Sequence, residues 1–172
     1  SYEAFEGWEE ALRAHLADML EEHGGDENAE AAEEIVALVA LPRMDFESDD
    51  ELIGNWRVRS LQSDALGAYV YNWFPARIYR EAQAFVFDKH SGSQRHRGLM
   101  ARASDDTVFF AGALYYDYQT PRLHSAFMDQ TAAREVDPEL DATALIHKLG
   151  PDHFLMVFDH EPNRFRFYEI GK

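Results

Sequence analysis

The spacing of apolar side chains changes near Gly54, and this change limits the folds that the chain can adopt. Before Gly54 the apolar residues recur every three or four positions, as on one face of an amphipathic helix, whereas after it they alternate with polar residues, as in a half-buried strand. Residues 52–59 begin the alternation with two arginines, and residues 163–168 repeat this arrangement near the end of the chain. We therefore predict an α+β fold with an arginine-bearing strand at each end of one antiparallel sheet or barrel.

The N-terminal segment is predicted to form two helices. Residues 2–22 have the apolar spacing of an amphipathic helix, and the pair Gly24 and Gly25 should end it. Asn28 is expected to cap a second helix over residues 29–41. The polar face is rich in glutamate, which opposes binding to anionic lipid, so we expect the apolar face to dock on the sheet.

These patterns divide the chain into three segments that form one compact unit. We predict an acidic helical hairpin over residues 1–42, a linker over residues 43–51 and an antiparallel β-domain over residues 52–172. The β-domain is expected to be either a closed or nearly closed barrel or a twisted sheet that the hairpin covers.

Turn residues separate the expected strands of the β-domain. The predicted strands span 55–62, 68–79, 84–90, 95–103, 107–115, 153–160 and 163–170, with a further one near 130–136. A short helix is expected to begin at Asp137-Pro138 and to end before Gly150. Aromatic residues on both faces of these strands indicate that both faces are covered, by a filled core or in part by a ligand cavity.

The net charge of −16 is unevenly distributed along the chain. Residues 1–51 hold 17 acidic and 2 basic side chains, whereas residues 52–102 hold 8 basic side chains and only 3 acidic ones. Arginine supplies nearly all of this positive charge, and arginine pairs well with carboxylate and phosphate groups. The arginines either pair with the acidic arm and with acids on the strands, or form a surface for an anionic ligand or an acidic partner.

Several classes of function are disfavoured. The overall negative charge opposes binding to nucleic acid, and no apolar run approaches the length of a membrane span. The chain has no cysteine, which excludes thiol catalysis and disulfides, and it lacks the common nucleophile, zinc-protease, phosphate-loop and dinucleotide motifs. We therefore predict no catalytic residues, no cofactor and no bound metal.

The histidines offer two loose pairs as an alternative. His90 and His96 flank a predicted hairpin beside Asp88, so they could converge on a metal or serve a hydrolase or isomerase. His153 and His160 form the second pair. Exposed turn histidines explain both pairs more simply.

Residues 71–78, 86–89 and 92–95 together resemble an uncharacterised proteobacterial family, the domain of unknown function 4893. The hairpin Gly92-Ser93-Gln94-Arg95 is the most specific part of this resemblance, which covers roughly residues 50–172. It implies an exported bacterial protein and supplies no activity. It also implies cysteines where this chain has Val58 and Ala76, so that apolar packing would replace a cross-strand disulfide.

A looser resemblance is to lipocalins, which open on Gly-x-Trp and carry an arginine on the last strand that stacks on this tryptophan. Gly54-Asn55-Trp56 and Arg164 or Arg166 fit this pattern. A guanidinium on an indole face gains about 0.5–2 kcal/mol, so such a pair could seal one end of a barrel.

The leading functional hypothesis is a non-catalytic envelope protein that binds a small apolar or anionic ligand in its β-domain. The expected ligand contacts are Trp56, Arg57, Tyr71, Arg77, Arg95 and Arg166. The alternative is an interaction module without a pocket, which would dock an envelope protein through the acidic hairpin or through the edge at Arg95.

The expected location is the periplasm or another exported compartment. The chain starts at Ser1 without an initiator methionine, which fits removal of an export signal, although a tag remnant or arbitrary numbering explains this start equally well.

Overall fold

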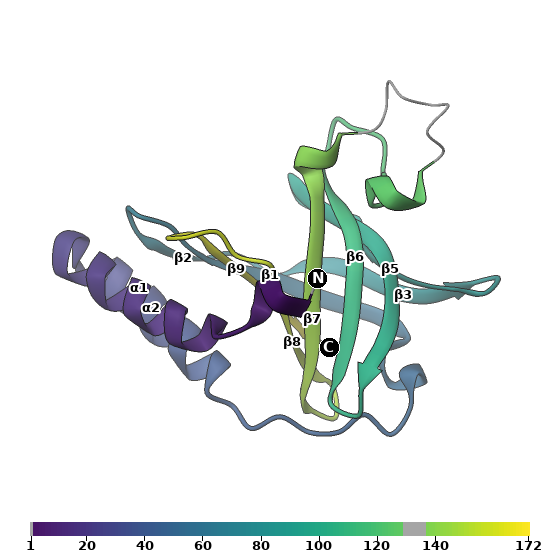
Figure 1. Cartoon of the computed structure of the whole chain (residues 1–172), viewed down its shortest axis with the longest axis horizontal. Coiled ribbons are helices and arrows are strands. Elements are labelled where there is room, and N and C mark those ends of the chain that lie inside the picture. Colours follow the sequence, from purple (N-terminus) through teal and green to yellow (C-terminus); the bar gives the residue numbers. More distant parts are fainter. Residues whose placement is uncertain (1, 129–136) are drawn as a thin grey trace.

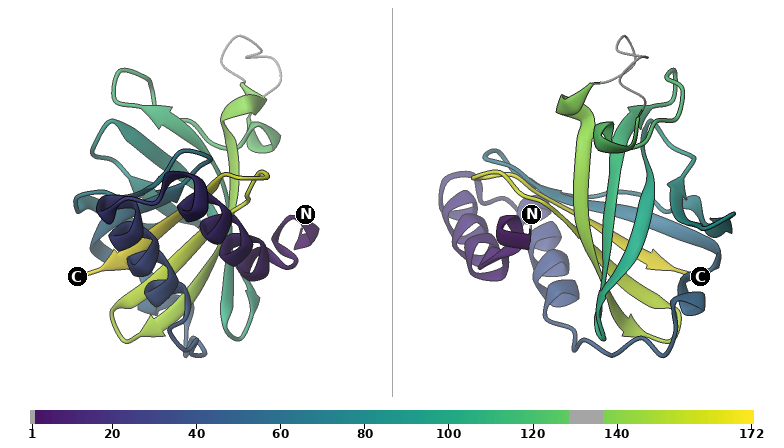
Figure 2. Two further views of the ribbon diagram at one scale, coloured as in Figure 1. Left: turned by 90° about the vertical axis from the view of Figure 1, so that its left-hand side faces the viewer. Right: turned by 45° about the vertical axis from the view of Figure 1, so that its right-hand side comes forward.

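The computed structural model describes residues 2–128 and 137–172, in which a helical hairpin packs on the outside of a closed antiparallel β-barrel (Figure 1). The hairpin comprises a 3-10 turn, η1 (Tyr2–Phe5), and the helices α1 (Trp8–His23) and α2 (Asp26–Val39). In the left view of Figure 2 these purple and blue helices cross in front of the yellow and lime strands. The predicted helical hairpin is confirmed.

The predicted cap at Asn28 is wrong. Helix α2 (Asp26–Val39) starts three residues earlier than predicted, with Gly25 at the cap position, so Asn28 lies inside the first turn. Its side chain donates to the His23 carbonyl at 2.8 Å and accepts from the Ala68 N–H at 3.1 Å. Asn28 therefore ties the two helices to each other and to the β-domain.

Eight strands form the barrel. They are β1 (Gly54–Ser63), β3 (Phe74–Glu81), β4 (Ala84–Lys89), β5 (Gln94–Ser104), β6 (Thr107–Tyr116), β7 (Asp141–Gly150), β8 (His153–Phe158) and β9 (Phe165–Gly171). Each strand pairs antiparallel with the next in this order, and β9 returns to β1 through seven residue pairs, from Arg57↔Gly171 to Ser63↔Phe165. The sheet is therefore closed, as the barrel alternative predicted.

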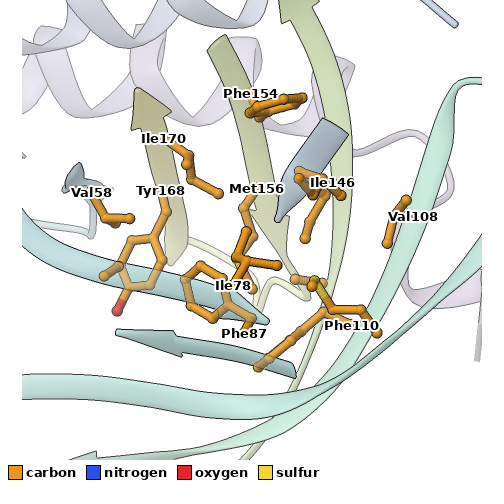
Figure 3. Packing of buried hydrophobic residues seen from close by; sticks show 14 of the residues in the cluster. Val58, Ile78, Phe87, Val108, Phe110, Ile146, Phe154, Met156, Tyr168 and Ile170 are labelled. Atoms are coloured by element: carbon orange, nitrogen blue, oxygen red, sulfur yellow. The ribbon is translucent and has the colours of Figure 1, made fainter. Parts of the chain in front are cut away.

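Alternation along each strand produces two cores. Within β1, Trp56 and Val58 point into the barrel, whereas Leu61 points outward beneath the helices. Buried side chains from several strands fill the barrel interior, as Figure 3 shows. The outer core joins the apolar faces of α1 and α2 to outward residues of β1, β7, β8 and β9. The barrel is thus covered on both faces where the hairpin lies.

The segment between the hairpin and β1 runs along one end of the barrel, where it appears as the blue coil at the bottom of Figure 1. Its backbone bonds to the barrel twice, from Met44 N to Lys148 O at 2.9 Å and from Phe46 N to Asp105 O at 2.8 Å. The Phe46 ring is buried and stacks on Phe154 with centroids 5.9 Å apart. The segment then enters a 3-10 turn, η2 (Asp49–Leu52), so this end of the barrel is filled.

One strand prediction needs correction. The strand expected over 68–79 is split into the short β2 (Ala68–Val70), which pairs with the far end of β1, and β3. Residues 71–73 leave the ladder between them, and the Trp73 ring packs against two arginines of β1.

The helix expected after Asp137 is also wrong. A 3-10 turn, η5 (Pro138–Leu140), leads directly into β7. The strand expected near 130–136 lies outside the described residues. A further 3-10 turn, η3 (Ser125–Phe127), precedes that segment.

Val58 and Ala76 are both buried in the barrel interior. Val58 pairs with Phe74, and Ala76 pairs with Trp56, so the two residues are diagonal neighbours on one face of adjacent strands. Apolar packing therefore occupies the position where the family resemblance implies a disulfide.

Among residues 2–128 and 137–172, no helix has both the length and the apolar character needed to cross a membrane.

Candidate functional site

The end of the barrel opposite the filled end contains a cavity of about 170 Å³. The turn between β4 and β5, the start of β3 and the inward faces of β1 and β9 surround it. The lining residues are Ser60, Gln62, Tyr71, Phe74, Lys89, Gly92, Ser93, Gln94 and Tyr168. Tyr71 and three residues of the predicted hairpin motif therefore meet at this cavity.

The hairpin motif forms one wall of the cavity because its backbone turns sharply at Gly92. Gly92 has a φ of +78°, in the left-handed region that favours glycine. The Lys89 ammonium donates to the carbonyls of Ser91 and Gln94, both at 2.7 Å, and Arg95 Nε donates to the Gly92 carbonyl at 2.7 Å. Arg95 thus folds back on its own turn and supports it.

Lys89 is the charged group that lines this cavity. It is only 4% exposed, and its ammonium lies over the rings of Phe74 and Tyr168, at 5.0 and 5.9 Å from their centroids. Burial, with additional repulsion from Arg95 and Arg166, lowers the pKa of Lys89 to about 8. The surroundings of Lys89 therefore disfavour its charged form relative to the neutral amine.

Arg166 stands beside Lys89 on the inner face of β9, opposite Gln62 of β1. Its guanidinium donates to the Gln94 side-chain oxygen at 3.3 Å. Burial lowers the pKa of Arg166, and the nearby Arg164 contributes to the same shift. Arg166 was predicted as a ligand contact, and the structure places it at the edge of the cavity through Gln94.

Among residues 2–128 and 137–172, the cations at this end of the barrel have no acidic partner. Within the described parts of the chain, Lys89, Arg95 and Arg166 form no salt bridge. Burying a charge without a counter-charge is costly. An anion in the cavity would supply a counter-charge that no salt bridge among the described residues provides.

His96 and Tyr168 form a hydrogen-bonded pair below the cavity. The Tyr168 hydroxyl lies 2.6 Å from His96 Nδ1, and the imidazole also packs on Phe158 with centroids 4.6 Å apart. Burial holds the pKa of His96 well below 6.5, and burial raises the pKa of Tyr168. Both groups are therefore neutral near pH 7, and the hydrogen bond between them joins two uncharged partners.

A second cavity, of about 310 Å³, lies on the other side of Arg166. His96, Tyr116, Phe158, Asp159 and Arg166 are among its lining residues. The Arg166–Gln94 and His96–Tyr168 hydrogen bonds connect its walls to those of the first cavity.

Trp56 does not reach the cavity. It is buried towards the filled end of the barrel, where its indole donates to the Leu52 carbonyl at 2.7 Å and meets Phe154 edge-on. The cation on its ring is Lys172, at 4.9 Å from the centroid. The stacking expected from Arg164 or Arg166 is therefore wrong, because Arg166 points into the opposite end of the barrel.

Arg57 and Arg77 lie on the outer face of the barrel, away from the cavity. Arg57 packs on Trp73 at 5.5 Å and donates to the Lys172 carbonyl at 2.8 Å. Arg77 forms a salt bridge with Asp88 at 3.3 Å. The outer position follows from strand alternation, since their neighbours Trp56, Val58 and Ala76 face inward.

The two histidine pairs do not converge. His90 is exposed at the turn, whereas His96 points into the barrel. His153 bonds to Glu169 at 2.7 Å, whereas His160 stacks on Phe165. Across the residues that the structure describes, no group of three or more histidine or acidic side chains is placed to hold a metal.

Sequence reasoning missed Lys89 and Tyr168 as site residues. Lys89 follows Phe85 and Phe87 at the spacing of one strand face, so alternation places it on the buried face of β4. A lysine on the apolar face of a predicted strand was the sequence feature that could have identified Lys89 as a site residue. Tyr168 follows Arg166 at the same spacing on β9.

Comparison with known proteins gives a family and a distant structural likeness. The family model described as "Domain of unknown function (DUF4893)" matches residues 2–163. No curated protein matches the chain. A solved structure described as a redesigned β-barrel aligns with a TM-score of 0.41 and 8% identity, covering 72% of this chain and 92% of its own. At that score the likeness carries no argument about function.

Proposed function

Because the chain belongs to a family of unknown function, DUF4893, we propose from its geometry that it binds a small anionic ligand with an apolar body at the open end of its β-barrel. The proposed role is binding without catalysis, and His96 and Tyr168, which bond to each other, are assigned to the barrel interior and to no chemical step. An exported location, as the family resemblance implied, belongs to the same proposal.

The observation that carries this proposal is the unneutralised positive charge at the cavity. Lys89 is buried in the cavity wall, and Arg166 is bonded to Gln94 of the same wall. Both lack a carboxylate partner among the described residues, although the chain as a whole has a net charge of −16. A bound carboxylate would pair with both groups and remove an electrostatic cost of the free protein.

The cavity also limits the body of the ligand. Tyr71, Phe74 and Tyr168 supply aromatic walls, and Ser60 and Gln62 supply hydrogen-bonding groups. Cavities for drug-sized molecules are roughly 300–1,000 Å³, so a cavity of about 170 Å³ suits a smaller molecule. A single aromatic ring with a carboxylate has suitable chemistry, and benzoate is a suitable probe.

Calorimetric titration with benzoate tests the proposal. The unmodified chain should bind benzoate, and Arg166→Gln should weaken binding by about tenfold or more, because a hydrogen bond to a charged group contributes about 1.5–3 kcal/mol. Arg57→Gln is the matched control, since Arg57 lies on the outer face and should leave the affinity unchanged. Absence of binding at millimolar benzoate, or equal weakening by both variants, would refute the assignment.

A partner-binding role is the second candidate, and one surface feature favours it. Tyr69, Tyr71 and Trp73 are 38%, 47% and 37% exposed along one short segment. Contiguous exposed apolar side chains are typical of interaction surfaces. Trp73→Ala should then abolish association with an envelope protein and leave benzoate binding intact, which separates the two roles in one variant.

A further inference from the structure

The amine of Lys89 is held in a defined orientation in the cavity wall. Its two bonds to the Ser91 and Gln94 carbonyls run to the β4–β5 turn. A neutral lysine amine has two hydrogens, so these two acceptors can engage both and leave the nitrogen lone pair directed away from the turn. The same residue lines the cavity, where a ligand would meet that lone pair.

Arg166 provides an anchor for an anionic group close to this amine. Its guanidinium reaches Gln94, the residue whose carbonyl accepts from Lys89. Arg166 also repels the Lys89 ammonium directly, so the two groups are near each other. A small acid whose carboxylate is held by Arg166 would then present its adjacent carbonyl carbon towards the lysine nitrogen. Small 2-oxo acids have this arrangement of groups.

We propose that Lys89 condenses reversibly with the carbonyl of a small 2-oxo acid whose carboxylate is held by Arg166. This inference rests on the proposed anion site and names the chemical class of its ligand. It makes Lys89 a covalent capture site rather than a catalytic residue, since no further reaction of the bound acid is required.

The chemistry balances without another reactant. The neutral Lys89 nitrogen forms a bond to the carbonyl carbon, and a proton passes from nitrogen to the carbonyl oxygen to give a carbinolamine. Loss of this hydroxyl group with the remaining nitrogen hydrogen releases one water and leaves the imine. No oxidant or reductant is needed, and hydrolysis reverses the sequence.

Burial and repulsion supply the neutral amine that this step requires. In the free protein they lower the pKa of Lys89 to about 8, so about half of the amine is neutral at pH 8 before an acid binds. An ordinary lysine, with a pKa of about 10.4, is neutral in less than roughly one molecule in a hundred at that pH. Desolvated lysines beside other cations are known to be activated in this way.

Trapping with pyruvate and sodium cyanoborohydride, followed by peptide mapping, tests the proposal on the full chain. The reductant converts an imine to a stable secondary amine, and the chain offers only three lysines, Lys89, Lys148 and Lys172. We expect labelling of Lys89 at pH 8 to exceed that of the other two by about tenfold or more. The α-amino group serves as a positive control for the reagent.

Competition and variants define the remaining outcomes. Lactate, which has the same carboxylate but no carbonyl, should suppress labelling of Lys89, and Arg166→Gln should reduce it by about tenfold. Lys89→Arg should lose the adduct, whereas Lys172→Arg should change neither the adduct nor benzoate binding. Labelling that is equal at the three lysines, or that ignores lactate, would overturn the imine.

The two proposals fail in different ways. If benzoate and lactate bind in the calorimeter and Lys89 gives no pyruvate adduct, the imine is wrong and the anion site stands. If neither acid binds, the anion site is wrong and the imine proposal fails with it.

Discussion

At Lys89 the protein keeps a cation that its surroundings disfavour, since burial and two guanidinium groups lower the pKa to about 8. A bound carboxylate reverses this effect by adding a counter-charge, so binding should raise the pKa and take up protons near pH 8. Above pH 8 the free protein loses the Lys89 ammonium, so the Kd for benzoate should rise by about tenfold per pH unit. The rise should stop at the pKa that Lys89 has in the benzoate complex.

Proton uptake is measured by titrating benzoate at pH 8 in two buffers that differ in ionisation enthalpy. The apparent binding enthalpy of the unmodified chain should depend on the buffer, and that of Lys89→Arg should not. Identical enthalpies for the unmodified chain in both buffers would contradict a role for Lys89 in binding.

Gly92 combines a left-handed backbone with a position against the cavity. An added Cβ would lie 3.1 Å from Lys89 Nζ and 3.4 Å from the Phe74 ring. Gly92→Ala should therefore lower the free energy of unfolding by about 1–2 kcal/mol for the backbone alone and should also weaken benzoate binding. Urea unfolding and calorimetry measure the two effects.

Gly7→Ala is the matched control for this prediction. Gly7 has a similar φ of +70°, but an added Cβ would meet nothing within 4 Å. Gly7→Ala should lower the free energy of unfolding by the same backbone contribution and leave the affinity for benzoate unchanged. If both variants bind benzoate as well as the unmodified chain, the turn does not limit the cavity.

At the scale of elements, Asn28 is one of the polar links between the helical hairpin and the β-domain. Asn28→Ala removes the acceptor of the Ala68 N–H, a buried donor, while alanine regains about 0.5 kcal/mol of helix propensity. We expect a net loss of about 1 kcal/mol in the free energy of unfolding, measured by urea denaturation. Glu30→Ala, on the exposed face of the same helix, should show no loss, and an equal effect of both changes would exclude the link.

Sequence periodicity predicted the elements whose two faces differ. Strands β1 and β5 alternate visibly, and α1 has a single apolar face, so these elements follow from the residue pattern. Strand β7 does not alternate, because residues 144–148 are all buried: Ile146 lies inside the barrel and Leu145 lies beneath the hairpin. Such a continuous buried run does not distinguish strand from helix.

The candidate site was predictable only in part, because it joins residues that are far apart in the sequence. The hairpin motif and Tyr71 could be identified from turn residues and aromatic alternation, and Arg166 from its strand. The neighbourhood of Lys89 and Arg166 depends on closure of the barrel between β1 and β9, which brings together residues 77 positions apart. No local pattern contains that pairing.

At the scale of the whole molecule, the acidic arm neutralises much of the positive charge on the barrel. The pairs are Glu34 with Arg59, Asp49 with Arg80 and Arg102, and Asp50 with Arg80. These arginines therefore pair with the acidic arm on the outer surface, which is the first of the two explanations that the sequence offered for the arginine excess. The cations at the cavity differ because they face away from this arm.

Acidification should destabilise the whole fold through histidines that are buried in their neutral form. Burial, and then repulsion from Arg43, lowers the pKa of His147 to about 4, and burial holds the pKa of His96 well below 6.5. As pH falls below 6.5, the unfolded chain takes up protons that the folded chain cannot accept. By linkage the free energy of unfolding then falls with pH, down to about pH 4 for His147.

His147→Phe isolates this contribution because the histidine makes little use of its polar atoms. Its Nε2 has no hydrogen-bond partner in the described structure, and its Nδ1 lies 3.4 Å from the Thr107 hydroxyl. At pH 7.5 the free energy of unfolding of the variant should lie within about 1 kcal/mol of that of the unmodified chain. Between pH 6 and 4.5 the difference should shift in favour of the variant by up to about 1.4 kcal/mol per pH unit. His90→Gln, at an exposed turn, should follow the unmodified chain throughout. Urea unfolding at several pH values gives the free energy of unfolding of the three proteins as a function of pH. Parallel curves for His147→Phe and the unmodified chain would mean that His147 titrates normally in the folded protein.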